Sequence, residues 1–475
     1  MLLIAGIVLL GGLLRYWGSL GDLWLDEIHS LQLILGLTSA SETFTALHGD
    51  GNHYLNSLFL YLLGWQEDWT VYRSLSLVTG LAAVLMGSLI GWRRGPLTAV
   101  TCTLLLSFSF PLIVYSSEAR GYAPAIFFAL VAYFALRQIL DEGGRGFVVL
   151  YWSASVLGFV SHLSFAHFFL AGLLWSAWRL RPGRTLLACA VRFAEIQLVP
   201  LACLAVLSAL SIAPMQIAGG PWIGIARTLA QVCALALGIP HQAPWIAAAV
   251  LACVVLAVLG LLALRRSGSD EWILYAGTLL LVPGLLMIAR PPGTIFPRYF
   301  LIPLVFFLLL MGHLLADWAG RGRAGRLAWI GVMLAVLIGN GVETARFLER
   351  SRGHYMDGLT YMVEQSVGAE VSVGSDHPYR NPMVLAFYSR HLPDGAQVTY
   401  FGERYLPIGN QIVLSDGNDW PADGTEWFVV HSFEREPVPS ETLEVRGVEY
   451  ELARSFGYYG LSGWHWILYH RLGSG

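Results

Sequence analysis

The sequence places acidic, basic and aromatic side chains that could do chemistry in a few short segments. The first segment, LGDLWLDEIHSLQL (20–33), contains the adjacent acids Asp26 and Glu27 a few residues after the apolar run 1–18. A carboxylate near a bilayer surface is costly unless it faces water or has a function. One of the two carboxylates could therefore act as a general base while its neighbour stays structural. The alternative is a solvated loop with a helix N-cap at Asp26.

The other segments supply histidine, arginine and tyrosine. His53 follows a polar stretch in NHY (52–54), and His162 ends LGFVSH (157–162). The alternative for both histidines is a structural role at the end of a helix. His167 lies five residues after His162, a spacing that puts the two side chains on different faces of a helix and argues against a shared metal site.

Two segments carry arginine next to tyrosine. In VYSSEARGYA (114–123), Glu118, Arg120 and Tyr122 lie where one apolar run ends and the next begins, although Glu118 and Arg120 could simply neutralise each other. In RPPGTIFPRYFLIP (290–303), Arg298 and Tyr299 precede another apolar run. The planar guanidinium group matches phosphate oxygens, and the alternative is an arginine and a tyrosine that anchor the helix at the membrane interface. A carboxylate base combined with a cationic clamp suits transfer from a phosphate-linked donor.

These segments must be positioned by membrane-spanning helices. The chain has 475 residues, of which 56% are hydrophobic and only 13% are charged, about half the charge of a soluble domain. Because a spanning helix needs about 20 apolar residues, the hydrophobic runs predict a mainly α polytopic membrane protein with about eleven transmembrane helices. The predicted spans are 1–18, 70–91, 97–115, 122–138, 147–160, 162–178, 186–210, 243–264, 271–289, 299–316 and 327–345.

The arginines set the predicted orientation. All 29 basic residues are arginine, and loops containing residues such as Arg93, Arg265 and Arg323 fall on one side, which the positive-inside rule assigns to the cytoplasm. The long first loop (19–69), with seven acids and no arginine, and the C-terminal tail then lie outside a plasma (inner) membrane. The net charge of −3 argues against a nucleic-acid partner.

The tail differs in composition from the rest of the chain. Residues 346–475 hold 17 of the 32 acids and 10 of the 29 arginines. Strand-like runs at 370–376, 397–402, 426–432 and 464–471, with a helix-like stretch at 383–392, predict a small α/β domain with a partly parallel sheet. We therefore divide the chain into a membrane module (1–345) and a soluble extracytoplasmic domain (346–475).

The sequence resembles the GT-C superfamily of integral-membrane glycosyltransferases, in particular the bacterial relatives of protein O-mannosyltransferases and of the aminoarabinose transferase that modifies lipid A. The resemblance covers about 345 residues in order. It rests on WLDE (24–27), NHY (52–54), YSSEARGYA (115–123), LGFVSH (157–162) and PRYFLIPL (297–304). It implies the GT-C fold, a polyprenyl-phosphate sugar donor, and transfer to an acceptor on the outer face of the membrane.

The resemblance also suggests roles for the candidate residues. Asp26 matches the acidic residue on the first outer loop, and Glu27 is its companion. We expect Arg298, Arg120 and Tyr299 to bind the donor phosphate, and His53, Glu118, Tyr122 and His162 to form the shell of the cavity. The sequence indicates no metal ligands, although it leaves a divalent cation as cofactor open. Two rival functions remain: a transporter or lipid flippase, and a non-catalytic assembly protein.

Overall fold

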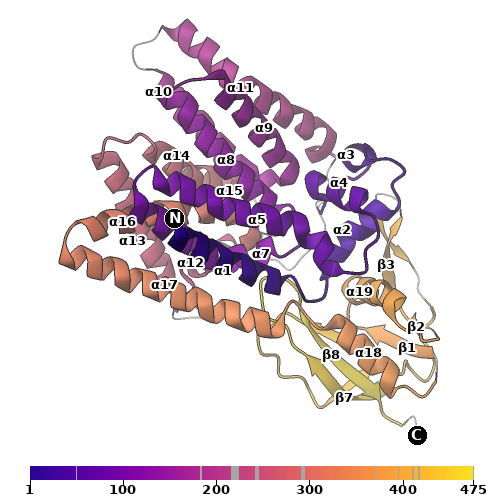
Figure 1. Cartoon of the computed structure of the whole chain (residues 1–475). Coiled ribbons are helices and arrows are strands. Elements are labelled where there is room, and N and C mark those ends of the chain that lie inside the picture. Colours follow the sequence, from indigo (N-terminus) through magenta and orange to yellow (C-terminus); the bar gives the residue numbers. More distant parts are fainter. Residues whose placement is uncertain are drawn as a thin grey trace. The chain divides into compact units, whose positions relative to one another are not determined.

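The computed structural model describes residues 1–473 except 50, 182–184, 215–223, 241–244, 290–294, 369, 394, 409–410 and 416–417. The chain divides into two compact units (Figure 1). Unit 1 consists of Met1–Trp17, His53–Phe59 and Tyr72–Thr344, and unit 2 of Gly18–Asn52, Leu60–Val71 and Ala345–Gly475.

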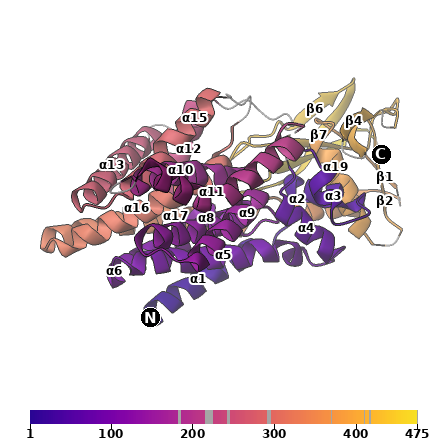
Figure 2. The same cartoon turned by 90° about the horizontal axis from the view of Figure 1, so that it is seen from above.

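Unit 1 is helical because its long apolar runs contain few charges and must satisfy their backbone polar groups internally. Helix α16 forms its core, with every residue from Leu301 to Ala316 buried, and packs against α6, α8 and α13. Helices α8 and α9 lie side by side (Figure 2). The α-helices that lie wholly or partly in unit 1 are α1 (Leu2–Gly18), α4 (Tyr54–Leu63), α5 (Trp69–Trp92), α6 (Pro96–Phe108), α7 (Phe110–Ser116), α8 (Tyr122–Asp141), α9 (Arg145–Ser161), α10 (Ala166–Leu180), α11 (Leu186–Leu207), α12 (Ile225–Leu237), α13 (Trp245–Arg266), α14 (Trp272–Ala276), α15 (Val282–Ala289), α16 (Leu301–Gly320) and α17 (Arg323–Arg350).

Among the described residues, six helices are long and apolar enough to cross a membrane, or seven if the bent pair α6 and α7 forms one span. The two helices of that pair meet at 61°. Ser109 is extended at the break and Pro111 lacks a backbone N–H, which explains the interruption. The split of 147–178 into two helices is confirmed, because His162 is extended between α9 and α10. The total of eleven spans stays a prediction.

Unit 2 contains a six-stranded sheet of order β2-β1-β5-β8-β7-β6. Strand β1 pairs in parallel with β2 and β5, and the remaining pairs are antiparallel. Helix α19 connects β1 to β2, so the predicted βαβ start and partly parallel sheet are confirmed (Figure 1). The elements of the tail are α18 (Tyr355–Gln365), β1 (Glu370–Ser375), α19 (Arg380–Tyr388), β2 (Gln397–Tyr400), β3 (Arg404–Ile408), β4 (Gln411–Ser415), β5 (Trp427–Ser432), β6 (Thr442–Val445), β7 (Val448–Phe456) and β8 (His465–Arg471).

The first loop packs with the tail inside unit 2. It forms helices α2 (Leu25–Leu35) and α3 (Glu42–Thr45), and α2 contacts α19. The Tyr388 hydroxyl donates to the Leu23 carbonyl at 2.9 Å, and the Met356 N–H donates to the Asp22 carboxylate at 2.8 Å. Burial raises the pKa of Asp22. The sequence grouped this loop with residues 1–345 by chain order, whereas in the structure it belongs to the same unit as the tail.

Candidate active site

Four aromatic rings from distant parts of the sequence form a cluster in unit 1, which we call the ring cluster: His53, Tyr122, His162 and Tyr299. The His53 and His162 ring centroids are 4.7 Å apart, and the Tyr122 ring lies 5.3 Å from His53 and 4.7 Å from His162. Tyr299 lies farther out, 6.4 Å from His162. The rings are tilted or edge-on, as aromatic pairs prefer.

Each member of the ring cluster sits where a helix begins or ends. His53 immediately precedes α4, Tyr122 is the first residue of α8, and His162 follows α9. Tyr299 belongs to the short 3₁₀ helix Pro297–Phe300 before α16. Side chains at helix ends can be held rigidly by the helices while they face a common space, which is how a bundle positions a site on several segments.

The connection between α7 and α8 is fixed by hydrogen bonds from neighbouring helices. Asn56 donates to the Ala119 carbonyl at 2.9 Å, and Ser76 donates to the Arg120 carbonyl at 2.9 Å. The Gly121 N–H donates to His53 Nδ1 at 2.8 Å. The side chains of Glu118 and Arg120 in this connection are buried. The sequence-predicted segment is therefore a rigid part of the core and not a solvated turn.

Two arginines act electrostatically on the ring cluster. Burial, reinforced by the charges of Arg120 and Arg298 and by His162, lowers the pKa of His53 well below its ordinary value. His53 is thus neutral at physiological pH. Since its Nδ1 accepts the Gly121 hydrogen bond, its proton lies on Nε2. The charges of the same two arginines act on His162, whose Nδ1 accepts a hydrogen bond from the Ser164 N–H at 3.0 Å.

This arrangement suits an oxyanion ligand. Two guanidinium groups and the Nε2–H donors of neutral histidines are the donors that phosphate oxygens accept. The Arg298 guanidinium lies over the Phe296 ring, 4.4 Å from its centroid, and this stacking restricts its side chain. The residues predicted as phosphate clamp and cavity shell are therefore brought together in unit 1.

Asp26 and Glu27 lie in unit 2 and differ in environment. Glu27 is fully buried, and its carboxylate accepts the Trp24 N–H at 3.2 Å at the start of α2. Asp26 is half-buried in the first helical turn, where the helix dipole favours a carboxylate. The N-cap residue is Trp24, so the alternative of an N-cap at Asp26 is wrong.

A polar cluster of the tail was missed by the sequence analysis. Arg380 donates to His431 Nε2 at 3.1 Å, and His431 Nδ1 lies 2.8 Å from the Asp376 carboxylate. The charge of Asp26 acts on Arg380. Burial, with help from Arg380 and His431, lowers the pKa of His377 to about 4. A signal was present in SDHPYRNP (375–382), a polar run directly after a predicted parallel strand, where sites commonly lie.

Two further points concern Arg290, the first residue of the segment 290–303, and a metal ion. Arg290 lies outside the described residues. Within the part of the chain that the structure describes, three or more His, Cys, Asp or Glu side chains never come together as a metal site would require. The described residues thus offer no ready ligand set for the divalent cation that the sequence left open.

Comparisons with known proteins identify the fold. No protein-family model matches the sequence, and no curated protein matches it significantly. A crystal structure of ArnT from Cupriavidus metallidurans bound to undecaprenyl phosphate has a TM-score of 0.52 at 12% identity, covering 100% of this chain and 98% of that chain. The apo state of the same protein has a TM-score of 0.51 at 12% identity, covering 84% and 85%. The chain has the GT-C fold.

The GT-C fold confirms the predicted architecture of a mainly helical polytopic membrane protein with a C-terminal α/β domain. A more distant similarity is to the Archaeoglobus fulgidus oligosaccharyltransferase in complex with Zn and sulfate, with a TM-score of 0.47 at 12% identity over 83% of this chain and 62% of that chain. The roles of the individual site residues stay predictions.

Proposed function

We propose that the protein is a membrane glycosyltransferase that moves a sugar from a polyprenyl-phosphate donor to an extracytoplasmic acceptor, which is a lipid, a glycan or a protein. The observation that carries the proposal is the convergence of Arg120 and Arg298 on the ring cluster in unit 1. The GT-C fold, shared with an ArnT structure that holds undecaprenyl phosphate, supports a lipid-phosphate donor.

The proposed reaction is a single displacement or its two-step equivalent at the anomeric carbon of the sugar. The acceptor oxygen forms a bond to this carbon, and the bond between the carbon and the phosphate oxygen breaks. The acceptor proton goes to Asp26, which acts as general base. The electron pair of the broken bond leaves with the polyprenyl phosphate, whose growing negative charge Arg120 and Arg298 stabilise.

The remaining residues have supporting roles in this proposal. Tyr299 and the neutral histidines His53 and His162 donate to or pack against the phosphate and sugar. Glu27 shapes the start of α2 through its hydrogen bond to Trp24. Arg380, oriented by His431 and Asp376, balances the charge of Asp26.

The direct test is transfer by the full-length protein in proteoliposomes. The donor is a synthetic polyprenyl-phosphate sugar with a radiolabelled sugar, and the acceptor is a cell-envelope extract of the source organism. We expect label to move from the donor to a new product only with active protein. Movement of the intact donor across the bilayer without cleavage would instead identify a flippase. Binding of the donor with neither sugar transfer nor movement across the bilayer would indicate an assembly protein.

The proposed location is the plasma membrane with the tail outside. In a variant without native cysteines, Val438→Cys in the exposed part of the tail and Arg323→Cys at the exposed start of α17 can be labelled with an impermeant maleimide. We expect intact spheroplasts to label position 438 only. Labelling of position 323 only would reverse the orientation.

A further inference from the structure

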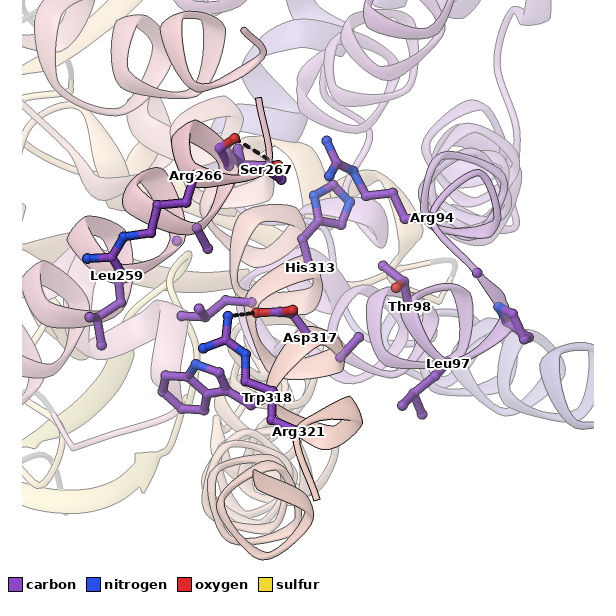
Figure 3. Close-up of a pocket in the computed structure, with 17 residues that line it drawn as sticks. Arg94, Leu97, Thr98, Leu259, Arg266, Ser267, His313, Asp317, Trp318 and Arg321 are labelled. Atoms are coloured by element: carbon purple, nitrogen blue, oxygen red, sulfur yellow. Dashed lines mark hydrogen bonds and ion pairs between the residues drawn. The ribbon is translucent and has the colours of Figure 1, made fainter. Parts of the chain in front are cut away.

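Unit 1 contains a cavity of about 670 Å³ that none of the proposed catalytic residues line. Its walls come from the start of α6, the C-terminal half of α13 and the C-terminal half of α16 (Figure 3). Its volume lies within the range of about 300–1,000 Å³ that is typical of small-molecule sites. We call it the α6–α13–α16 pocket.

The charged side chains of the pocket are mostly cationic. Arg94, Arg266 and Arg321 line it together with a single described carboxylate, Asp317. Asp317 forms an ion pair with Arg321. Figure 3 shows Arg94 and Arg266 on opposite sides of the pocket and the Asp317–Arg321 pair along another wall. The lining is thus suited to an anionic group.

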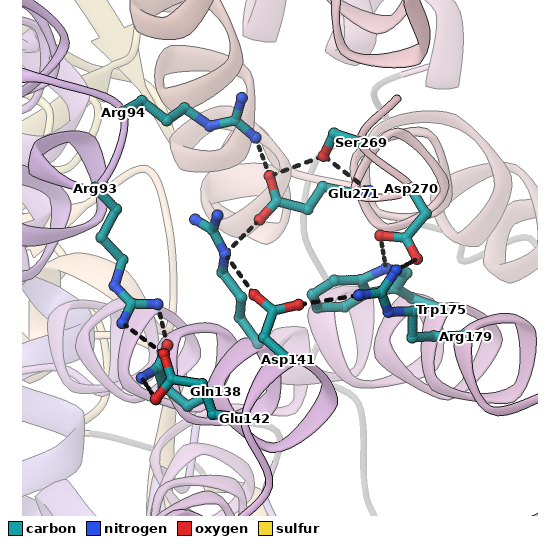
Figure 4. A network of polar contacts seen from close by, with 11 residues as sticks. Arg93, Arg94, Gln138, Asp141, Glu142, Trp175, Arg179, Ser269, Asp270 and Glu271 are labelled. Atoms are coloured by element: carbon teal, nitrogen blue, oxygen red, sulfur yellow. Dashed lines mark hydrogen bonds and ion pairs between the residues drawn. The ribbon is translucent and has the colours of Figure 1, made fainter. Parts of the chain in front are cut away.

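Arg94 is held in position by a network of ion pairs. It contacts Glu271 (Figure 4). Glu271 also pairs with Arg137 at 2.9 Å. The network continues through Arg179, which bridges Asp141 at 3.2 Å and Asp270 at 3.1 Å. Because these residues come from the ends of α8 and α10 and from the α13–α14 connection, the network ties several helices together.

His313 is an unpartnered polar side chain that lines the same pocket. It is only 7% exposed, and neither ring nitrogen has a hydrogen-bond partner among the described residues. The charge of Arg94 acts on this ring, and Figure 3 shows the two side chains close together. A buried polar group without a partner is costly. A ligand oxygen near Arg94 would supply the missing partner.

An apolar surface leads from this pocket along α13. Seven large hydrophobic side chains of this helix, including Trp245 at its start, are at least 38% exposed, and the spacing of the other six places them along one face. Leu259 belongs to this surface and also lines the pocket. The six residues are Leu251, Val254, Val255, Val258, Leu259 and Leu262. In a membrane protein such a face contacts acyl chains.

We propose that the α6–α13–α16 pocket binds the phosphate headgroup of an anionic membrane phospholipid whose acyl chains lie along α13. The three arginines complement the phosphate charge, and His313 hydrogen-bonds a headgroup oxygen. The apolar face of α13 favours a lipid over a free phosphate, because a soluble anion would leave that face without a role in binding. This site shares no residue with the ring cluster.

The test uses the purified full-length protein in a neutral detergent. Bound lipid is counted by native mass spectrometry after addition of phosphatidylglycerol or phosphatidylcholine, and thermal unfolding is followed with the same lipids and with sodium phosphate alone. We expect phosphatidylglycerol to be retained and to stabilise the protein more than phosphatidylcholine does. Equal retention of the two lipids would overturn the proposal. If sodium phosphate stabilised the protein as much as phosphatidylglycerol does, the pocket would bind free phosphate and not a lipid headgroup.

Matched variants localise the site. Arg266→Gln should weaken phosphatidylglycerol binding about tenfold or more, because it removes a charge-assisted contact. Arg265→Gln is the control, since Arg265 is the adjacent residue and lies instead over the Trp272 ring at 5.7 Å. His313→Leu should also weaken lipid binding without lowering the unfolding temperature of the lipid-free protein. Equal losses in the Arg265 and Arg266 variants would show a nonspecific charge effect and contradict the proposal.

Discussion

His53 Nδ1 accepts a hydrogen bond of 2.8 Å from the backbone N–H of Gly121, 68 residues later in the chain. This bond joins the residue before α4 to the residue before α8 and fixes the tautomer of the histidine. Because both Arg120 and Tyr122 flank Gly121, the same bond positions one proposed phosphate ligand and one ring of the cluster. The geometry of the site therefore depends on how closely these two segments can approach.

A methyl group at position 121 tests this close approach. A Cβ atom on Gly121 would lie 1.9 Å from the Ser161 carbonyl oxygen and 2.9 Å from His53 Cβ. Gly121→Ala should thus push the segments apart, lower the stability by about 1–3 kcal/mol, and weaken donor binding. Gly146→Ala is the control, because a Cβ there meets nothing within 4 Å. Thermal unfolding and donor titration measure both effects, and a Gly121→Ala variant as stable as the control would contradict the packing.

The phosphate clamp predicts a specific loss at Arg298. Arg298→Ala should weaken donor binding by about 1.5–3 kcal/mol, roughly 10- to 150-fold in Kd, because a charge-assisted contact to phosphate is lost. Arg298→Lys should recover only part of this, since lysine lacks the planar fork. The exposed Arg145→Ala serves as control. Donor affinity is measured by titration with the polyprenyl-phosphate sugar. An unchanged affinity in Arg298→Ala would show that other arginines bind the donor phosphate.

Buried neutral His53 predicts a dependence of stability on pH. The pKa of His53 is well below 6.5 in the folded protein, so on acidification the unfolded chain binds a proton at this residue before the folded protein does. Its contribution to stability is full above about pH 6.5 and falls as the pH drops below that value. From pH 7.5 to 5.5 the loss from this residue alone is at most about 1.4 kcal/mol.

The variant His53→Gln measures that contribution. Its unfolding temperature should fall less than that of the wild type between pH 7.5 and 5.5. The variant His354→Gln, which replaces a partly exposed histidine of unit 2, is the control and should follow the wild type. An identical pH dependence in His53→Gln and the wild type would show that His53 is not buried as a neutral ring.

Replacing Arg380 should lower the rate of sugar transfer without changing donor affinity. In unit 2 Arg380 is held by His431 and interacts with the charge of Asp26. Arg380→Gln should lower the transfer rate about tenfold, within the range of an electrostatic contribution, and leave donor affinity unchanged. Arg390→Gln, an exposed arginine just beyond α19, is the control. Equal rates in the two variants would limit Arg380 to a structural role.

Local patterns allowed much of the fold to be predicted from the sequence. Long apolar runs predicted the helices of unit 1. The apolar stretch 147–178 was compatible with one long helix or two short ones, and two were predicted because that number makes the orientation of the arginine-rich loops consistent; the structure has the break at His162. Strand-like runs of residues predicted strands β1, β2, β5 and β8 of the tail, and the predicted bounds agree with the observed bounds to within two residues. The order of motifs also identified the segments that carry His53, Arg120, Tyr122, His162 and Tyr299, which the structure brings together in unit 1.

Contacts between distant segments were not predictable in this way. The Tyr388–Leu23 hydrogen bond joins residues 365 positions apart, so chain order could not show that the first loop packs with the tail. Glu27 and Asp26 are adjacent in sequence, yet only the structure shows that Glu27 is buried at the helix start whereas Asp26 is half-buried. Arg380 was missed because its relation to Asp26 depends on that same long-range packing.

The most direct test of the central claim is the transfer rate of Asp26→Asn with a polyprenyl-phosphate sugar and its acceptor. Asparagine keeps the shape of the side chain but cannot accept the acceptor proton, so transfer should fall by about two to four orders of magnitude, while donor affinity stays near wild type. Glu27→Gln should have a milder effect, because Glu27 caps α2. An Asp26→Asn protein that folds, binds donor and transfers sugar at the wild-type rate would contradict the account.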